Sequence, residues 1–243
     1  MSHSDYRNDR RQFLLAGLGV AAAALAAPSW LQAAEPAKLK IGVVGSGKVG
    51  SALGGAWIKT GHQVMFSSTK IENDKTLAAS LGPNALAGTP REAAQFADVL
   101  LISVPFSALA AVGKELGDLL KGKIVIDTCN AYERRDGEIA KAALEKGIAY
   151  ANAELLPGAR TVRAFNAIGA FRMGTGLQDS VHLGIPIAGQ DEQATATVSA
   201  LIREIGFEPV SVGWSLANQL RPDTPLAGEH TPEELRNIVA TLK

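Results

Sequence analysis

Residues 39–67 read LKIGVVGSGKVGSALGGAWIKTGHQVMFS, and this stretch decides the fold. It begins with a run over 39–44 that is apolar except for Lys40, which is typical of a strand buried on both faces. A helix is expected over 48–60, where it would end at Gly61, and residues 63–67 predict a second strand. A glycine-rich turn therefore lies between a strand and a helix, as it does in dinucleotide-binding βαβ units.

Three glycines in this turn form the pattern G-x-G-x-x-G. Gly45 would permit the tight turn, Gly47 would let the backbone approach a pyrophosphate, and Gly50 would let the helix pack closely on the strand. Residues 42–48 also read as the start of a Walker A loop. Val49 stands where the Ser or Thr that holds Mg²⁺ is needed, so a nucleoside triphosphatase is excluded. A glycine turn with a purely structural role stays an alternative.

The rest of the chain alternates short apolar runs with helical segments. Strands are expected at 85–87, 98–104, 123–127, 161–166, 185–188 and 208–212. Helices are expected at 71–81, 90–96, 107–120, 137–146 and 192–205, with a last one from 232. This alternation predicts the α/β class: a doubly wound Rossmann fold with a parallel sheet and a small α/β C-terminal extension.

The first 34 residues read as an export signal rather than as part of the fold. A polar segment ends at Arg10-Arg11, residues 13–27 are apolar without a charge, and Ala33-Ala34 precedes Glu35. The string from Arg10 to Leu14 resembles the twin-arginine consensus. We expect a twin-arginine signal peptide cleaved near Ala34 and a periplasmic mature protein. A signal for the general secretory route and an uncleaved membrane anchor are the alternatives.

Composition excludes several classes of function. Lys and Arg balance Asp and Glu at 24 each, so nothing indicates a nucleic-acid partner. The single cysteine, Cys129, excludes an intramolecular disulfide, and we expect it to be a buried small residue because no nearby base would activate it. The four histidines lie far apart without metal-ligand spacing, so no metal site is expected.

The end of the second predicted strand bears on the choice of cofactor. Proteins that bind NAD place Asp or Glu there to accept a hydrogen bond from the ribose 2′-hydroxyl. This chain has Ser67, Ser68, Thr69 and Lys70, with no acid before Glu72. Hydroxyl donors and one positive charge suit a 2′-phosphate, so we predict NADP as the cofactor. An ordinary polar turn that caps the next helix would explain the same residues.

Several segments together resemble the deazaflavin (coenzyme F-420)-dependent NADP oxidoreductases. Many families share the glycine loop, and further segments complete the resemblance. They are SVPFSAL at 103–109, KIVIDTCN at 123–130, ELLPGARTVRAFNAIG at 154–169 and IGFEPVSVG at 205–213. The chain is also similar to the nucleotide-binding domain of six-transmembrane ferric reductases. The resemblance covers most of the chain after the signal.

This resemblance implies a dinucleotide site that runs from the glycine loop to the nicotinamide at the strand ends. The predicted cofactor-binding residues are Gly45, Ser46, Gly47, Lys48, Val49, Gly50, Ser67, Ser68, Thr69, Lys70, Val104, Pro105, Phe106, Asn130, Ala164 and Asn166. No catalytic residue is predicted. We expect a signal peptide at 1–34, an NADP-binding Rossmann domain at 38–168, and a small C-terminal α/β portion at 169–243 that completes the acceptor cleft.

The function expected from this site is hydride transfer between NADPH and a flat conjugated acceptor of the flavin or deazaflavin kind. The sequence shows no paired carboxylates and no Ser/His/Asp set, which suits an enzyme whose nicotinamide carries the chemistry. A non-catalytic dinucleotide-binding sensor or redox-complex subunit is the alternative, because NADPH is not regenerated in the periplasm. The expected partner is a small-molecule redox acceptor, with membrane contact only during export; a homodimer stays open.

Overall fold

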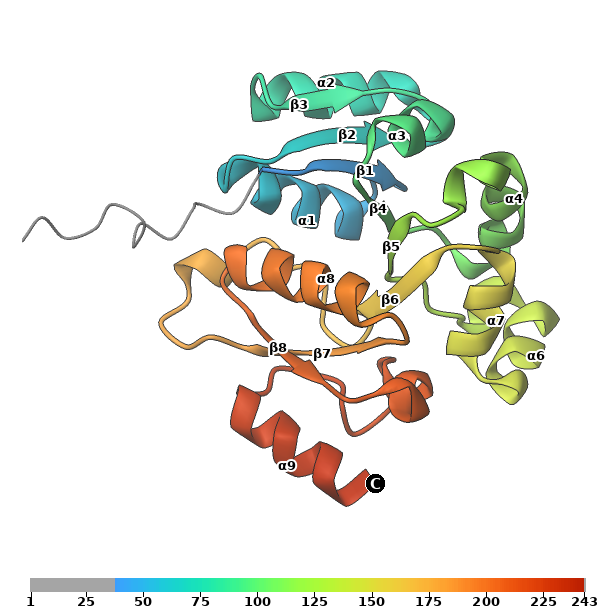
Figure 1. Cartoon of the computed structure of the whole chain (residues 1–243), viewed down its shortest axis with the longest axis vertical. Coiled ribbons are helices and arrows are strands. Elements are labelled where there is room, and N and C mark those ends of the chain that lie inside the picture. Colours follow the sequence, from blue (N-terminus) through green and yellow to red (C-terminus); the bar gives the residue numbers. More distant parts are fainter. Residues whose placement is uncertain (1–37, 243) are drawn as a thin grey trace, which may run out of the picture. The chain divides into compact units, whose positions relative to one another are not determined.

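One mixed sheet forms the centre of the computed structural model, which describes residues 38–242. Within this range it has eight strands in the order β3-β2-β1-β4-β5-β6-β7-β8, from top to bottom in Figure 1. The strands are β1 (Lys40–Val44), β2 (Gln63–Ser67), β3 (Ala85–Ala87), β4 (Val99–Ile102), β5 (Ile124–Asp127), β6 (Arg160–Ala164), β7 (Gly184–Gly189) and β8 (Glu208–Ser211). The order reverses between β1 and β4, which is the topological switch point of a doubly wound fold.

Helices cover both faces of the sheet. They are α1 (Lys48–Lys59), α2 (Ile71–Leu81), α3 (Pro90–Phe96), α4 (Phe106–Leu116), α5 (Glu133–Asp136), α6 (Glu138–Lys146), α7 (Ile148–Leu155), α8 (Glu192–Glu204) and α9 (Pro232–Leu242). Alternate residues of each central strand enter different cores. Val99 and Leu101 of β4 pack with side chains of α1 and α8, whereas Leu100 and Ile102 pack with α3, α4 and α7. The predicted Rossmann fold is confirmed.

The predicted parallel sheet is confirmed for every neighbouring pair of strands except one. β6 and β7 run antiparallel, with Ala164 opposite Ile187, whereas every other neighbouring pair is parallel. A parallel connection needs a crossover that carries the chain back along the sheet. Residues 165–183 contain only a short 3₁₀ turn at Gly176–Gln178, so the chain stays at the carboxyl edge of β6. This connection therefore supplies residues to that edge of the sheet.

The predicted C-terminal portion joins the same sheet. β7 and β8 extend the sheet beyond β6, and α8 and α9 pack against them. The last helix starts as predicted at Pro232, where the side chain of Glu234 accepts a hydrogen bond from the Thr231 N–H. Two short helices, α5 and α7, were not predicted. The predicted helix over 107–120 ends at Leu116, and residues 117–120 form a 3₁₀ turn instead.

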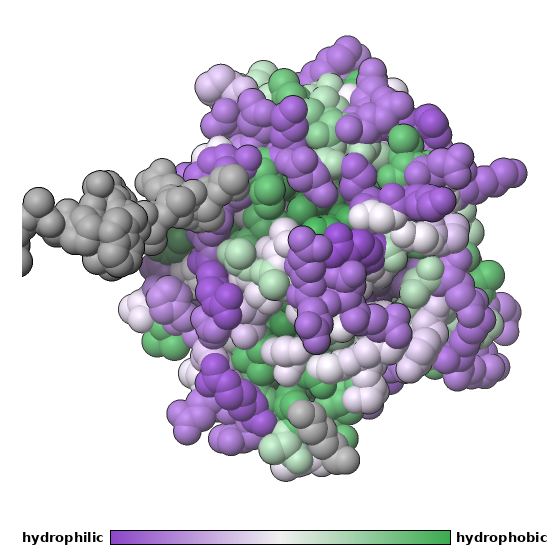
Figure 2. Space-filling model, viewed as in Figure 1, coloured by the Kyte–Doolittle hydropathy of each residue, from purple (hydrophilic) through white to green (hydrophobic). Residues whose placement is uncertain are grey.

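Hydrophilic side chains are spread over the face of the molecule seen in Figure 2, with hydrophobic residues visible in smaller areas between them. Among the described residues, no helix has both the length and the apolar character that crossing a membrane requires. The predicted signal peptide lies outside the described residues.

Candidate functional site

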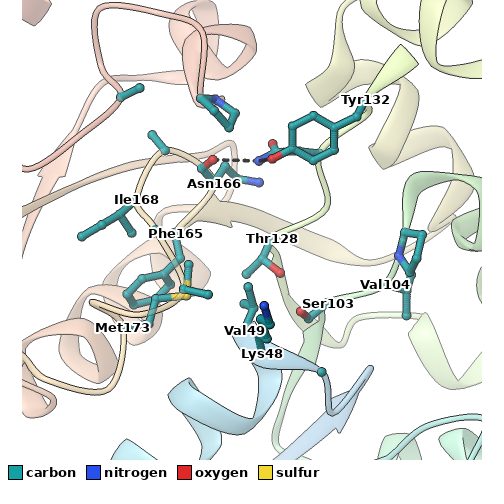
Figure 3. A pocket seen from close by; sticks show the side chains of 18 of the residues that line it. Lys48, Val49, Ser103, Val104, Thr128, Tyr132, Phe165, Asn166, Ile168 and Met173 are labelled. Atoms are coloured by element: carbon teal, nitrogen blue, oxygen red, sulfur yellow. Dashed lines mark hydrogen bonds between the residues drawn. The ribbon is translucent and has the colours of Figure 1, made fainter. Parts of the chain in front are cut away.

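A cleft of about 520 Å³ opens at the carboxyl ends of the central strands. Its walls come from the glycine turn, from the segments that follow β4, β5 and β6, and from the loop over 222–228. In Figure 3, Lys48 and Val49 lie on one side of the cleft and Asn166 and Tyr132 on the other, with Thr128 between them. This place is the switch point at which open α/β sheets bind their ligands.

The glycine turn has the backbone that its sequence predicts. Gly45 has a φ of 100°, and a Cβ there would lie 2.2 Å from the Ser103 carbonyl oxygen. A Cβ on Gly50 would lie 2.2 Å from the Gly45 carbonyl oxygen, so this glycine permits close packing of helix and strand. Gly47 instead has no neighbour within 4 Å of an added Cβ, and it lines the cleft. The turn is therefore tight on its protein side and open on its cleft side.

The N-terminus of α1 faces this open side. Gly47, Lys48 and Val49 all line the cleft, and no side chain of the described residues caps the helix. The N–H groups in the first turn of a helix have no partner within the helix, and the helix dipole adds partial positive charge there. Lys48 contributes a full positive charge at the same place. The arrangement suits a phosphate group.

Ser46 turns away from the cleft. Its N–H donates to the Ser67 carbonyl oxygen at 3.2 Å, and its hydroxyl donates to a carboxylate oxygen of Asp74. Ser46 does not line the cleft. Its side chain and its N–H therefore connect the glycine turn to β2 and α2.

The predicted 2′-phosphate corner contains an acid that the sequence analysis missed. Ser67 is buried and its hydroxyl donates to the Val43 carbonyl oxygen at 2.7 Å. The Ser68 hydroxyl donates to Asp74 at 2.8 Å. Asp74 is fully buried, whereas Thr69 and Lys70 are exposed. Glu72 is the first acid after β2 in the sequence, but the first turn of α2 brings Asp74 back to this corner.

Of the residues predicted to lie near the nicotinamide, some line the cleft and others are buried in the core. Val104, Pro105, Asn130 and Asn166 line the cleft. Phe106 and Ala164 do not, because the side chain of Ala164 packs in the core between the sheet and α1 and α8, and the ring of Phe106 packs in the opposite core. Asn130 and Asn166, which are 36 positions apart, are joined by a hydrogen bond.

Asn130 has its amide committed to the protein. Its Nδ2 donates to the Asn166 carbonyl oxygen at 2.7 Å, drawn as a dashed line in Figure 3. Its Oδ1 accepts from Arg163 at 3.4 Å, and Arg163 forms a fully buried ion pair with Asp127 at 2.5 Å. Asn130 therefore holds the backbone of Asn166 in position.

Asn166 has the opposite property. Its side chain is 3% exposed, and neither amide atom has a hydrogen-bond partner among residues 38–242. The preceding residue, Phe165, has a φ of 64°, the only positive φ of a non-glycine residue in the described part of the chain. Backbone strain and unpaired buried polar atoms both concentrate at functional sites. The lining of the cleft therefore includes a buried amide whose donor and acceptor are both unpaired among the described residues.

Tyr132 and Arg135 also line the cleft, although the sequence analysis did not single them out. The Arg135 guanidinium lies 4.9 Å from the centre of the Tyr132 ring and donates to Asp136. Burial raises the pKa of the Asp136 carboxyl, but hydrogen bonds from Arg135 and from the N–H groups of Tyr132 and Ser107 outweigh this and lower it to about 2. Arg135 therefore lies beside a carboxylate that is ionised at neutral pH.

Cys129 is buried, as predicted, at 1% exposure. Burial is the main cause that raises the pKa of its thiol far above the usual value, so it stays protonated and is a poor nucleophile. Within residues 38–242, no group of three or more His, Cys, Asp or Glu side chains is placed to hold a metal ion.

Comparison with known proteins agrees with this geometry. Residues 40–131, from β1 to just after β5, match the family described as NADP oxidoreductase, coenzyme F420-dependent. This match covers a segment that holds the glycine turn and strands β1 to β5. The resemblance found in the sequence is thereby confirmed, and the fold is that of NAD(P)-binding oxidoreductases.

Metalloreductases are among the curated proteins to which the chain is similar. Metalloreductase STEAP3 of Rattus norvegicus is 30% identical over 182 residues, which cover 74% of this chain and 34% of the relative. Metalloreductase STEAP2 of Homo sapiens is 27% identical over 177 residues, 72% of this chain and 34% of the relative. The chain thus spans about a third of the length of these relatives.

Solved structures show the same fold. The hypothetical protein SMa0349 of Sinorhizobium meliloti superposes with a TM-score of 0.70 at 24% identity, covering 80% of this chain and 96% of that one. A proposed F420-dependent NADP-reductase from Arthrobacter sp. FB24 gives a TM-score of 0.59 at 19% identity, covering 74% and 87%. At these identities the likeness establishes the fold alone.

Proposed function

We propose that the chain is an NADP(H)-dependent oxidoreductase that transfers a hydride between nicotinamide and a flat, conjugated acceptor of the flavin or deazaflavin class. The observation that carries this proposal is the buried, unpartnered amide of Asn166 in the switch-point cleft. A primary carboxamide offers both N–H donors and a carbonyl acceptor, so it can pair with both atoms of that amide. When bound, the nicotinamide ring supplies the hydride chemistry.

The residues of the cleft fit the pyrophosphate and the nicotinamide of a dinucleotide. The N–H groups of the α1 N-terminus and the Lys48 ammonium would hold the pyrophosphate. Asn166 would bind the carboxamide and so fix which face of the ring meets the acceptor. Val104, Ile168 and Met173 supply apolar side chains to the walls, which would limit the contact of water with the reacting atoms.

The lining also supports a particular kind of acceptor. In the part of the chain that the structure describes, neither a carboxylate nor an imidazole lines the cleft. Assisted proton transfer is most often performed by such groups, and the other acid–base side chains of the lining are Lys48, at the glycine turn, and the Tyr132 phenol. A conjugated ring system needs only the hydride from the cleft and can take its proton from water, so it suits this lining.

The test is whether the purified chain oxidises NADPH when an acceptor is supplied. Free flavin, a deazaflavin and a ferric chelate should be compared, the last because the curated relatives are metalloreductases. We expect oxidation with a conjugated acceptor, and none without an acceptor. If NADPH binds but no acceptor is reduced, the chain is a dinucleotide-binding module and the proposal is wrong.

Filling the cleft should separate turnover from coenzyme binding. Ala227 is half-buried and lines the cleft away from the glycine turn. In Ala227→Trp we expect kcat/KM for the acceptor to fall about tenfold or more, with the Kd for NADPH nearly unchanged, because displaced reactants lose their alignment. Ala196→Trp, on the exposed face of α8, is the matched control and should behave as wild type. Unchanged turnover in Ala227→Trp would place the acceptor elsewhere.

We also propose export by the twin-arginine route, with cleavage near Ala34 and a periplasmic mature protein. The support is the Arg10-Arg11 pair before an uncharged apolar run. Replacing this pair by Lys-Lys should leave the precursor in the cytoplasm, as measured by cell fractionation. Arg7→Lys, outside the pair, should be exported normally. Normal delivery of the Lys-Lys variant to the periplasm contradicts the proposal.

A further inference from the structure

Asp74 connects two loops that the proposed coenzyme would contact. It lies in the first turn of α2 and is fully buried. One carboxylate oxygen accepts a hydrogen bond from the hydroxyl of Ser46 in the glycine turn. The other accepts from the hydroxyl of Ser68 at the end of β2, at 2.8 Å. Both oxygens of the carboxylate are thus held by serines of two different loops.

These bonds change what the two serines can offer to a ligand. A hydroxyl has one proton to donate, and both protons point at Asp74. Only oxygen lone pairs remain for a group arriving from outside. The Ser68 hydroxyl also accepts from the Lys70 N–H at 3.1 Å, so that backbone donor is used as well. Ser46 and Ser68 are therefore poor donors to a phosphate.

Charges of both signs lie around this corner. Asp74 contributes a buried negative charge, and a field from a buried group is screened less than one from an exposed group. Lys70, exposed at the start of α2, contributes a positive charge. Glu72 and Lys75, also on α2, pair with each other at 2.8 Å and nearly cancel. The net charge at the corner therefore depends mainly on Asp74 and Lys70.

We propose that Asp74 is a coenzyme-specificity residue. Its negative charge repels the 2′-phosphate of NADP and so reduces the preference for NADP over NAD that Lys70 produces. This inference rests on the proposed function, because it assumes that a dinucleotide binds along the cleft. At this corner a phosphate meets the oxygen lone pairs of Ser46 and Ser68 and the negative charge of Asp74, which counteract the positive charge of Lys70. The 2′-hydroxyl of NAD carries no charge and can donate to the Ser68 oxygen, so NAD is also accepted.

The experiment compares the Kd values of NADP and NAD by titration calorimetry on the full mature chain. In Asp74→Asn, which keeps the shape and removes the charge, the preference for NADP over NAD should rise about tenfold, mainly through tighter binding of NADP. Lys70→Ala should lower the same ratio. Asp98→Asn is the matched control, because that carboxylate accepts from the Lys40 N–H at the opposite end of β1. Its ratio should equal that of wild type.

The outcomes separate this inference from the function on which it rests. If the wild type binds neither coenzyme, the proposed function fails. If the wild type binds both and the ratio is the same in Asp74→Asn, only the role of Asp74 is wrong. Asp74→Ser, smaller and also neutral, gives the same test if the asparagine variant does not fold. On the wild type alone, a preference for NADP of about a thousandfold or more would also overturn the inference.

Discussion

Asn166→Leu is expected to lower the affinity for NADPH about 100-fold while the protein stays as stable as wild type or becomes more stable. The two effects have opposite signs because the amide has no partner in the free protein. A buried polar group left without a hydrogen bond costs about 1–3 kcal/mol, and leucine has nearly the same branched shape without that cost. The thermal midpoint and the Kd of NADPH measure the two effects separately.

The expected loss of affinity follows from the bonds that the amide would form. Two hydrogen bonds to a carboxamide, made in a site that is 3% exposed, are each worth about 1–1.5 kcal/mol, and 1.4 kcal/mol is tenfold in affinity. Asn218→Leu is the matched control. The Asn218 side chain accepts from the Ala149 N–H at 3.0 Å, outside the cleft, so its loss should lower stability and leave NADPH binding unchanged.

A coenzyme analogue identifies the bond itself. The 3-acetylpyridine analogue keeps the carbonyl of the carboxamide but lacks its N–H donors. Wild type should bind it more weakly than NADPH, and Asn166→Leu should bind the two nearly equally, because the partner of the donor is gone. If Asn166→Leu discriminates between them as wild type does, the carboxamide does not pair with Asn166.

The parts of the fold that local backbone chemistry determines could be predicted from the sequence. The turn at Gly45 needs a positive φ and a close approach to β4, and only glycine meets both demands. The capping box at Thr89 and Glu92, with Pro90 in the first helical position, sets the start of α3 in the same way. In both cases the signal and the structure lie within a few residues of each other.

Features that depend on remote partners could not be predicted in this way. The antiparallel pairing of β6 with β7 follows from the lack of a helix between them, and the apolar runs of the two strands do not carry strand direction. The sequence placed Asn130 and Asn166 together as ligands of the coenzyme. The structure shows how they differ: Arg163 donates a hydrogen bond to the side-chain amide of Asn130, whereas no described residue bonds to the side-chain amide of Asn166.

Arg163→Met is expected to destabilise the fold by about 3–5 kcal/mol. Arg163 and Asp127 are both fully buried, and the guanidinium donates to the carboxylate at 2.5 Å. Removing the guanidinium leaves the Asp127 carboxylate buried, with Asn152 and the Cys129 N–H as its other hydrogen-bond donors. An uncompensated buried charge carries a cost of this size. For a domain of about 200 residues, we expect the thermal midpoint to fall by about 10 °C.

The same strand provides the control for this prediction. Arg160 also lies in β6, but this residue and its partner Asp191 are only half-buried, and their ion pair at 2.6 Å lies in contact with solvent. Arg160→Met should therefore change the thermal midpoint far less, because exposed ion pairs contribute little. Combining Arg163→Met with Asp127→Asn also removes the unpaired negative charge of Asp127 and should recover part of the lost stability. Equal thermal midpoints for Arg163→Met and Arg160→Met would mean that the buried pair does not stabilise the fold.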